Sequence, residues 1–283
     1  MNFGKSPTIS TANAARPTVP FAVVLCAIDA SRGSREAVKQ AIVLTAPGAV
    51  LRFVAVSQAR GTGLAEVAEL GSSRANAALE EAAHEAKEAG VSASVKLRTG
   101  SPTSDVLLGE AENHDLLVLG SHGVSRAGGI MLGSTATQAA HRTTVPLLVA
   151  RPGPPGYRFP DRILLASDGS ARSWPAARAT VRLADAFSST VEIAHVPRDT
   201  GAERRRILAA QAVEILEATG EEPLIAGACG HVAEVIVDAA RDFRASMVVV
   251  GHRGLRGMRA LGSVSERVVH RSPCSVLVVP PLG

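Results

Sequence analysis

The chain has 283 residues, a length typical of about two domains. Of these residues, 46% are hydrophobic and 20% are charged, proportions typical of a folded protein. Aromatic residues make up only 3%, so Val, Leu, Ile and Ala are expected to build the cores. The net charge of +4 comes from 30 basic residues dispersed among 26 acidic ones, which argues against nucleic-acid binding because such binding usually concentrates basic and aromatic residues on one face.

The elements predicted for the first half alternate between strands and helices. Residues 1–19 lack the apolar core of a signal peptide and are expected to form a flexible tail. The continuous apolar run 21–28 is typical of a strand that is buried on both faces. Ser34 is a candidate cap for the helix that ends near Leu44, and Gly90 is a candidate stop for a helix over 73–89. The remaining predictions are strands at 50–56, 91–97, 115–119 and 145–150, and helices over 103–112 and after Gly133.

The second half repeats the pattern of the first. Four blocks recur in the same order, and the last two keep a constant offset of 129 residues. The paired blocks are 23–29 with 163–168, 116–123 with 247–254, 133–134 with 262–263, and 141–149 with 270–278. Strands of the second half are therefore predicted near 161–167, 190–196, 223–228, 246–250 and 275–279.

The order of the elements predicts a duplicated α/β fold. Strands that alternate with helices are typical of a parallel sheet. We expect two tandem, doubly wound, Rossmann-like domains, each with a five-stranded, mainly parallel sheet and helices on both faces. Residues 151–156 are rich in Pro and Gly and continue neither a helix nor a central strand. The predicted boundaries are a tail at 1–19, a first domain at 20–150, a linker at 151–158 and a second domain at 159–283.

The cysteines and the apolar segments favour a cytoplasmic protein without membrane insertion. Cys26, Cys229 and Cys274 show neither CxxC pairing nor metal-ligand spacing, and such an odd, unpaired set favours a reducing compartment. No apolar stretch of the sequence reaches the roughly 18 residues that span a bilayer.

Two loops of the first half are predicted to meet at the carboxyl ends of the strands, where such sheets bind ligands. One loop carries Asp29, and the other runs from Gly120 through Gly123 to Gly133 and Ser134. Glycines there allow the backbone to approach an anion and tolerate positive φ. The helix after Gly133 would direct its N-terminal amides and dipole towards a phosphate, and the Ser134 hydroxyl could donate one more hydrogen bond. Asp29 could accept a hydrogen bond from a ribose hydroxyl or adenine amine, or ligate a metal together with the phosphates.

The G-2x-G-9x-G-[ST] spacing of this loop resembles that of ATP-binding members of the universal stress protein family. Those members carry the pattern after strand four and an Asp after strand one, and the resemblance covers the chain after residue 20, once in each half. It implies a fold of the adenine-nucleotide alpha-hydrolase type and ATP as the ligand, with Mg²⁺ as a candidate companion. The implied binding residues of the first half are Ala27, Ile28, Asp29, Val54, Ala55, Val56, Gly120, His122, Gly123, Gly133, Ser134 and Thr135.

The second half departs from this pattern in one respect. Only seven residues separate Gly254 from Gly262, so the loop is two residues shorter than its counterpart. Arg253, Arg256 and Arg259 could compensate by direct contact with phosphates. The sequence leaves open whether this half binds nucleotide; its candidate residues are Asp168, Gly251, Arg253, Gly254, Gly262, Ser263 and Val264.

Each candidate also has a structural explanation. Asp29 and Asp168 could cap the first helix of each half, and the glycines could serve tight turns alone. His122 and His252 could contact phosphate or face solvent, and neither is assigned a catalytic role. The run 204–206 of three arginines is expected to be a solvated helix face.

The sequence favours a regulatory nucleotide-binding protein over an enzyme. It contains no P-loop GxxxxGK[ST] and no HxGH or SGGxDS signature, so slow ATP hydrolysis is the most that is expected. The family resemblance implies a regulatory or protective role in the stress response. The alternatives are a nucleotide-independent interaction module and a weak ATPase. By the same resemblance, strand five of each half, 145–150 and 275–279, is expected to pair edge to edge as an intramolecular pseudo-dimer, and a further dimer of whole chains is plausible.

Overall fold

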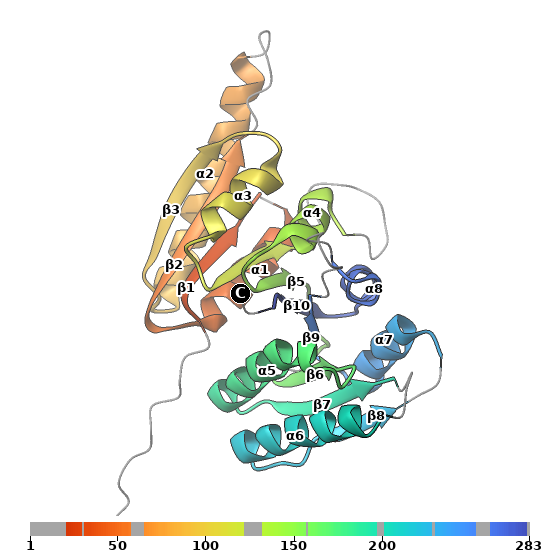
Figure 1. The fold of residues 1–283 in the computed structure, drawn as a ribbon. Coiled ribbons are helices and arrows are strands. Elements are labelled where there is room, and N and C mark those ends of the chain that lie inside the picture. Colours follow the sequence, from red (N-terminus) through yellow and green to blue (C-terminus); the bar gives the residue numbers. More distant parts are fainter. Residues whose placement is uncertain are drawn as a thin grey trace, which may run out of the picture.

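A computed structural model describes residues 21–29, 31–57, 65–121, 132–156, 158–196, 201–227, 230–252 and 261–281. The described strands form one ten-stranded sheet that consists of two five-stranded parallel halves (Figure 1). The first half contributes β1 (Phe21–Ala27), β2 (Thr45–Ser57), β3 (Ala93–Thr99), β4 (Leu116–Gly120) and β5 (Leu147–Ala150). The second contributes β6 (Arg162–Ala166), β7 (Thr190–His195), β8 (Leu224–Gly227), β9 (Met247–Gly251) and β10 (Ser275–Val279). The order is β3-β2-β1-β4-β5-β10-β9-β6-β7-β8, which confirms the predicted doubly wound fold.

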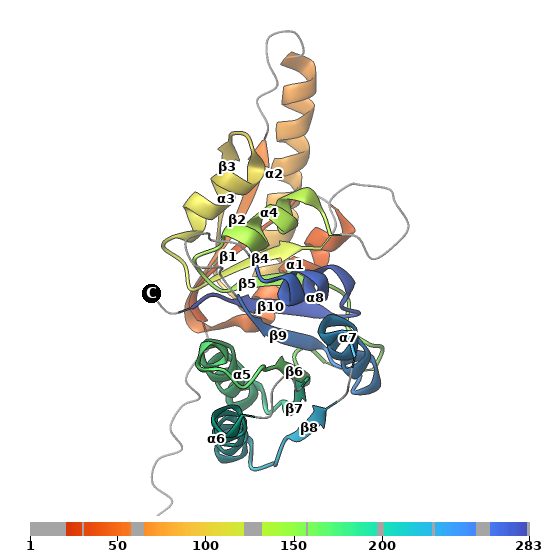
Figure 2. The same ribbon diagram turned by 45° about the vertical axis from the view of Figure 1, so that its right-hand side comes forward.

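Helices cover both faces of the sheet (Figures 1 and 2). One core cluster joins the sheet to α1 (Arg32–Leu44), α2 (Ala65–Glu88), α5 (Trp174–Phe187) and α6 (Ala202–Thr219). The other joins it to α3 (Thr103–Ala111), α4 (Ser134–Arg142), α7 (Val232–Asp242) and α8 (Ser263–Arg271), and a 3-10 turn, η1 (Ala171–Ser173), precedes α5. In the described part of the chain, no helix combines the length and the apolarity needed to cross a membrane.

The two halves are joined at the centre of the sheet by an antiparallel pair of strands. Val276, Leu277 and Val278 of β10 lie opposite Val149, Leu148 and Leu147 of β5, and all six are fully buried. Strand five of each half therefore pairs with the other within the chain. Because the pair is antiparallel, the strands of the two halves run in opposite directions, and their carboxyl ends lie at opposite ends of the sheet.

The first helix begins differently from the prediction. Ser31, not Ser34, is the N-cap of α1, and its hydroxyl accepts a hydrogen bond from the Ser34 N–H at 3.1 Å. The Ser34 hydroxyl instead accepts a hydrogen bond from the Asp29 N–H at 3.1 Å. From the sequence, either serine could cap the helix. The Ser34 hydroxyl is occupied by the Asp29 N–H, and Ser31 is the cap. The predicted stop of α2 at Gly90 is present, with φ +75° at that residue.

Arg151, the first residue of the predicted linker, is buried at the junction of the two halves. Its side chain is 4% exposed, and Nη2 donates to the Val269 carbonyl of α8 at 2.6 Å. Its own carbonyl accepts hydrogen bonds from Gln40 Nε2 of α1 at 2.8 Å and from Ser275 Oγ of β10 at 3.0 Å. Burial lowers the pKa of Arg151 to about 10, so the guanidinium remains charged at neutral pH. The side chain of Gln40 thus connects the first half to the last strand of the second.

Replacing this connecting side chain should destabilise the whole chain. Gln40→Ala removes the donor to the Arg151 carbonyl and the acceptor of the 2.7 Å hydrogen bond from Ser275 Oγ. We expect the free energy of unfolding in urea to fall by about 1–3 kcal/mol, because the remaining groups are buried. Lys39→Ala, at the exposed neighbouring position, is the control. A Gln40→Ala variant as stable as the control would contradict the role given to this network.

Candidate functional site

A cavity of about 270 Å³ opens at the carboxyl ends of β1, β2 and β4, between α3 and α4. Val54, Leu107 and Leu119 form an apolar, buried floor, and Asp29 and Ser134 contribute polar groups. This combination of an apolar floor with few polar groups is typical of ligand pockets. Of the predicted binding residues, the cavity wall includes Ala27, Ile28, Asp29, Val54, Val56, Gly120, Gly133, Ser134 and Thr135.

Three of the predicted residues of the first half are not found in this wall. Ala55 points to the opposite face of the sheet, as alternation along β2 requires, and packs in the core beneath α1 and α2. His122 and Gly123 lie outside the described residues. Sequence reasoning did not find Thr103 and Leu107 of α3, which also line the cavity. The order of the elements could have revealed them, because α3 follows β3 and therefore starts at the carboxyl ends of the strands, where the cavity opens.

The start of α4 supplies backbone donors to the cavity. Ser134, Thr135 and Ala136 line it and belong to the first helical turn, whose N–H groups have no partner within a helix. Gly133 is the N-cap, and no described side chain caps this end. Its φ of −66° is accessible to any residue, so the expected tolerance of positive φ is not used here. Without a capping side chain, the amides and the positive end of the helix dipole remain available to an anion.

Gly120 is required by the packing of the backbone. A Cβ at this position would lie 2.5 Å from the carbonyl carbon of Gly33 and 2.8 Å from the nitrogen of Ser34. Only glycine therefore lets the end of β4 approach the start of α1 this closely. The contact sets the position of one wall of the cavity.

Asp29 is held by a turn and does not cap α1. The Ser31 N–H donates to Asp29 Oδ1 at 3.1 Å, and Ser31 itself is the cap. Among the described residues, no donor reaches Asp29 Oδ2. The exposed carboxylate therefore retains an oxygen that can accept a hydrogen bond from a ligand in the cavity.

Comparison with known proteins identifies the family. A model described as "Universal stress protein family" matches residues 20–151 and again 160–280. The chain belongs to the universal stress protein family. Universal stress protein YxiE of Bacillus subtilis (strain 168) is 32% identical over 42% of this chain and 98% of its own length. The Thermus aquaticus universal stress protein of the QAH/OAS sulfhydrylase 3′ region is 37% identical over 41% of this chain and 96% of its own length.

A solved structure has the same fold over nearly the whole length. A universal stress protein from Archaeoglobus fulgidus DSM 4304 superposes with a TM-score of 0.74 at 22% identity, covering 93% of this chain and 99% of the other. The family assignment and the tandem arrangement predicted from the repeat are thus confirmed.

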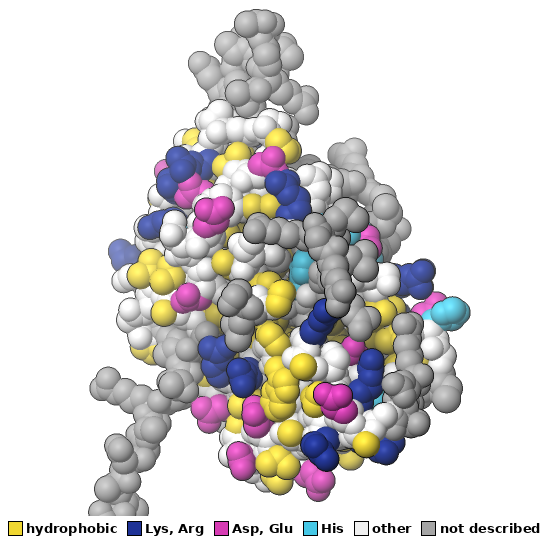
Figure 3. Space-filling view, viewed as in Figure 1, with side chains coloured by type: hydrophobic (Ala, Val, Ile, Leu, Met, Phe, Trp, Pro, Cys, Tyr) yellow, Lys and Arg dark blue, Asp and Glu magenta, His cyan; other side chains and the backbone are white. Residues whose placement is uncertain are grey.

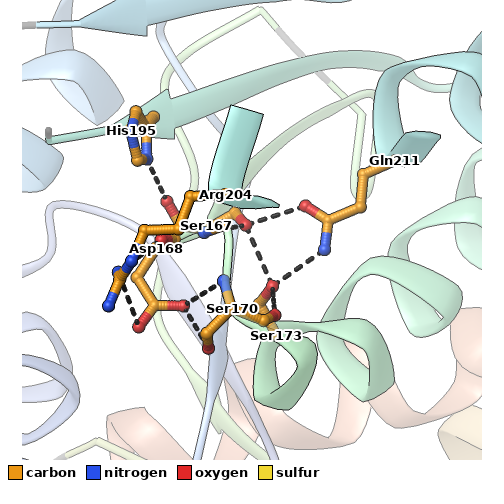
Figure 4. Close-up of polar contacts among 8 residues, drawn as sticks. Ser167, Asp168, Ser170, Ser173, His195, Arg204 and Gln211 are labelled. Carbon is orange, nitrogen blue, oxygen red and sulfur yellow. Dashed lines mark hydrogen bonds and ion pairs between the residues drawn. The ribbon is translucent and has the colours of Figure 1, made fainter. Parts of the chain in front are cut away.

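The second half of this universal stress protein holds its aspartate differently from the first (Figure 4). Asp168 Oδ1 accepts hydrogen bonds from the Ser170 N–H at 3.0 Å and from Ser170 Oγ at 2.6 Å, which repeats the turn at Asp29. In addition, Arg204 Nη1 of α6 donates to the Asp168 carbonyl at 2.9 Å and lies 3.9 Å from Oδ2. Arg204, predicted to belong to a solvated face, is therefore partly buried against the loop.

Polar side chains also fill the space between α5 and α6. Gln211 is fully buried. Its Oε1 accepts a hydrogen bond from Ser167 Oγ at 2.7 Å, and its Nε2 donates to Ser173 Oγ at 2.8 Å. His195 Nδ1 lies 2.9 Å from the Ser167 carbonyl (Figure 4). The corresponding space of the first half, between α1 and α2, is a second cavity of about 240 Å³ whose wall includes Ala78 and Ala82. The halves thus share a strand order but differ in how this space is filled.

The start of α8 resembles that of α4 but is more acidic. Gly262 is its N-cap with φ −65°, followed by Ser263 and Val264, and no described side chain caps it. Glu266 lies in the first turn of α8, whereas that of α4 has no acidic residue. A carboxylate there opposes anion binding. Gly251 ends β9, while Arg253, Gly254, Arg256 and Arg259 lie outside the described residues.

The end of α4 contacts the second half of the chain. His252 directly follows β9, and its Nε2 lies 3.3 Å from the carbonyl of His141 near the end of α4. His141 Nε2 in turn lies 3.2 Å from Glu266 Oε1 of α8. Burial lowers the pKa values of both His252 and His270 from 6.5. The same helix that begins at the first cavity therefore ends beside His252 and α8 of the second half.

The two loop glycines should respond differently to alanine. Gly120→Ala should lower the free energy of unfolding by about 1–3 kcal/mol, because its Cβ meets backbone atoms of α1 that cannot move independently. Gly251→Ala is the matched control, since the nearest atom to its Cβ, the Arg172 carbonyl oxygen, is 3.7 Å away. Urea unfolding of both variants tests the contrast, and equal losses would show that the close approach at Gly120 is not the cause.

Acidification should destabilise the protein through the histidines between the halves. The unfolded chain binds protons near the ordinary His pKa of about 6.5, while burial disfavours the charged form of His252 and His270 in the folded state. The free energy of unfolding should therefore decline as the pH falls from 7 through 6. His252→Gln should reduce that decline, whereas His84→Gln, at a side chain that is 73% exposed, should not. Urea unfolding across this pH range measures both slopes, and identical slopes for His252→Gln and the wild type would refute the effect.

Proposed function

We propose that the first half binds ATP at the cavity between α3 and α4. The observation that carries the proposal is the placement of the Asp29 carboxylate and of the uncapped amides of α4 around one apolar floor. The base would lie against Val54 and Leu107, and Asp29 would accept a hydrogen bond from the ribose or adenine. The phosphates would bind the amides of Ser134 and Thr135. The glycine spacing shared with ATP-binding family members supports the same assignment.

A magnesium ion would enter with the nucleotide. Within the described residues, no group of three or more His, Cys, Asp or Glu side chains is arranged to hold a metal. Mg²⁺ commonly combines one or two carboxylates with phosphate oxygens and water. Asp29 is the carboxylate of the cavity wall that could fill this role.

The chemistry of the wall favours a regulatory binding protein over a dedicated catalyst. Of the wall residues that the structure describes, Asp29 is the one with a charged side chain, and none is a Lys, His or Cys. Hydrolysis would thus depend on this single carboxylate to orient water. We propose that nucleotide occupancy serves as a signal in a stress response, and we place the protein in the cytoplasm, where the free thiols of Cys26 and Cys274 would remain reduced. A weak ATPase is the second candidate, and loss of turnover in Asp29→Ala would support it.

The site is tested by blocking each half in turn. Gly133→Trp places an indole at the start of α4, and Gly262→Trp places one at the equivalent position of α8. ATP binding by calorimetry and nucleotide released from the denatured, purified protein are the readouts, and circular dichroism verifies folding. We expect about one ATP per chain in the wild type, loss of ATP in Gly133→Trp, and retention of ATP in Gly262→Trp. The second half should not bind ATP because Asp168 is already paired with Arg204 and because Glu266 places a negative charge in the first turn of α8.

Other results lead to other functions. Loss only in Gly262→Trp would assign the site to the second half. A wild-type protein that neither releases nor binds nucleotide would refute the ATP proposal and favour the nucleotide-independent interaction module.

A further inference from the structure

One exposed face of α6 carries opposite charges at its two ends. Arg206, Ala210, Val213 and Glu217 follow one another at spacings of four, three and four residues, which places them on one side of the helix. All four are exposed, and Val213 retains 51% of its accessible surface. In the lower part of Figure 3, where α6 lies in Figure 1, basic, acidic and hydrophobic side chains lie next to one another. We refer to these four residues as the α6 stripe.

The α6 stripe is complementary to itself. If a second α6 packs antiparallel against it about a two-fold axis between positions 211 and 212, Arg206 of each helix faces Glu217 of the other. The same operation places Ala210 opposite Val213, so that the centre is small and apolar. Neither the Arg206 guanidinium nor the Glu217 carboxylate forms an ion pair or hydrogen bond with another described residue. Isologous interfaces require this kind of match, in which one patch fits its own symmetry copy.

The first half provides an internal comparison. The buried residues Leu79, Ala82 and Ala86 of α2 recur as Leu208, Gln211 and Ile215 of α6, each 129 residues further on. By this offset, the α6 stripe corresponds to Ala77, Glu81, His84 and Glu88. That face of α2 has no basic end, and its His84 already pairs with Glu88 at 3.3 Å. The apolar centre and the charge complementarity are therefore features of α6 and not requirements of the fold.

The neighbouring edge of the sheet extends the apolar surface. β8 is a terminal strand of the sheet, and Leu224 and Ile225 are 69% and 49% exposed. The opposite terminal strand, β3, presents Lys96 and Arg98, both paired with Glu110 of α3. Charged residues on an edge strand discourage pairing with other chains. β8 lacks such charges, so the α6 side of the molecule is the one suited to association.

We propose that two copies of this chain form a dimer through α6, with the helices antiparallel and Val213 at the centre of the contact. The charge pattern identifies a second copy as the partner, because each end of the α6 stripe matches the other end of the same sequence. Val213 and Leu216, 51% and 40% exposed, supply the apolar contact, and the two Arg206–Glu217 pairs set the orientation. The interface is independent of β5 and β10, which are already paired within the chain.

The first test is the mass of the full-length protein by sedimentation equilibrium over a range of concentrations. The wild type should sediment as a dimer that dissociates on dilution. Val213→Lys should raise the dissociation constant by about tenfold or more, since it places a charge at the centre of the contact. His84→Lys, at the corresponding exposed position of α2, is the matched control and should leave the constant unchanged. Circular dichroism and thermal unfolding verify that both variants are folded.

The second test exchanges the charges. Arg206→Glu and Glu217→Arg should each weaken the dimer, because like charges then face one another, and the double variant should restore it by reversing both pairs. A monomeric wild type, a dimer indifferent to Val213→Lys, or a double variant no tighter than the single ones would overturn the proposal. None of these measurements involves nucleotide, so their outcome is separate from that of the ATP site.

Discussion

The antiparallel contact between β5 and β10 is the interaction on which the rest of this structure depends. It joins two parallel half-sheets through side chains that are fully buried on both faces, and it leaves β3 and β8 as the ends of the sheet. It also reverses the direction of the second half, so the carboxyl ends of the two half-sheets lie at opposite ends of the sheet. Arg151, Gln40 and Ser275 form hydrogen bonds with one another beside this contact. An unpaired edge of this apolar character would otherwise invite association with other chains.

Duplication has produced two halves with the same strand order and different chemistry. The tight contact at Gly120 has no equivalent at Gly251, where a Cβ would have 3.7 Å of space. Asp29 faces a cavity, whereas Asp168 lies beside Arg204. The space between the first two helices is open in one half and filled by Gln211 in the other. The halves therefore differ in the surroundings of their aspartates, with a cavity in the first and an arginine in the second.

Most of the fold could be predicted from the sequence because its signals are local. Apolar runs marked the strands, Gly90 marked the end of a helix, and the recurrence of whole blocks revealed the duplication. The loop residues Asp29 and Gly133 could also be found, since their positions relative to strands and helices are fixed along the chain. The contact of Arg204 with Asp168 and the burial of Arg151 could not, because both depend on partners far away in sequence. Nor did any motif distinguish Ser31 from Ser34 as the helix cap, a choice that the hydrogen bond from Asp29 decides.

The long separation of β5 and β10 along the chain has a consequence for synthesis. When the ribosome has completed β5, the first half contains all of its own strands, but the outer edge of β5 lacks its neighbour. More than one hundred residues separate Ala150 from Ser275, so at ordinary translation rates this apolar edge waits on the order of ten seconds for its partner. During that interval, two nascent first halves on neighbouring ribosomes present identical edges that can pair with each other. Correct folding of this protein is therefore a competition between a strand still to be made and the same strand of another chain.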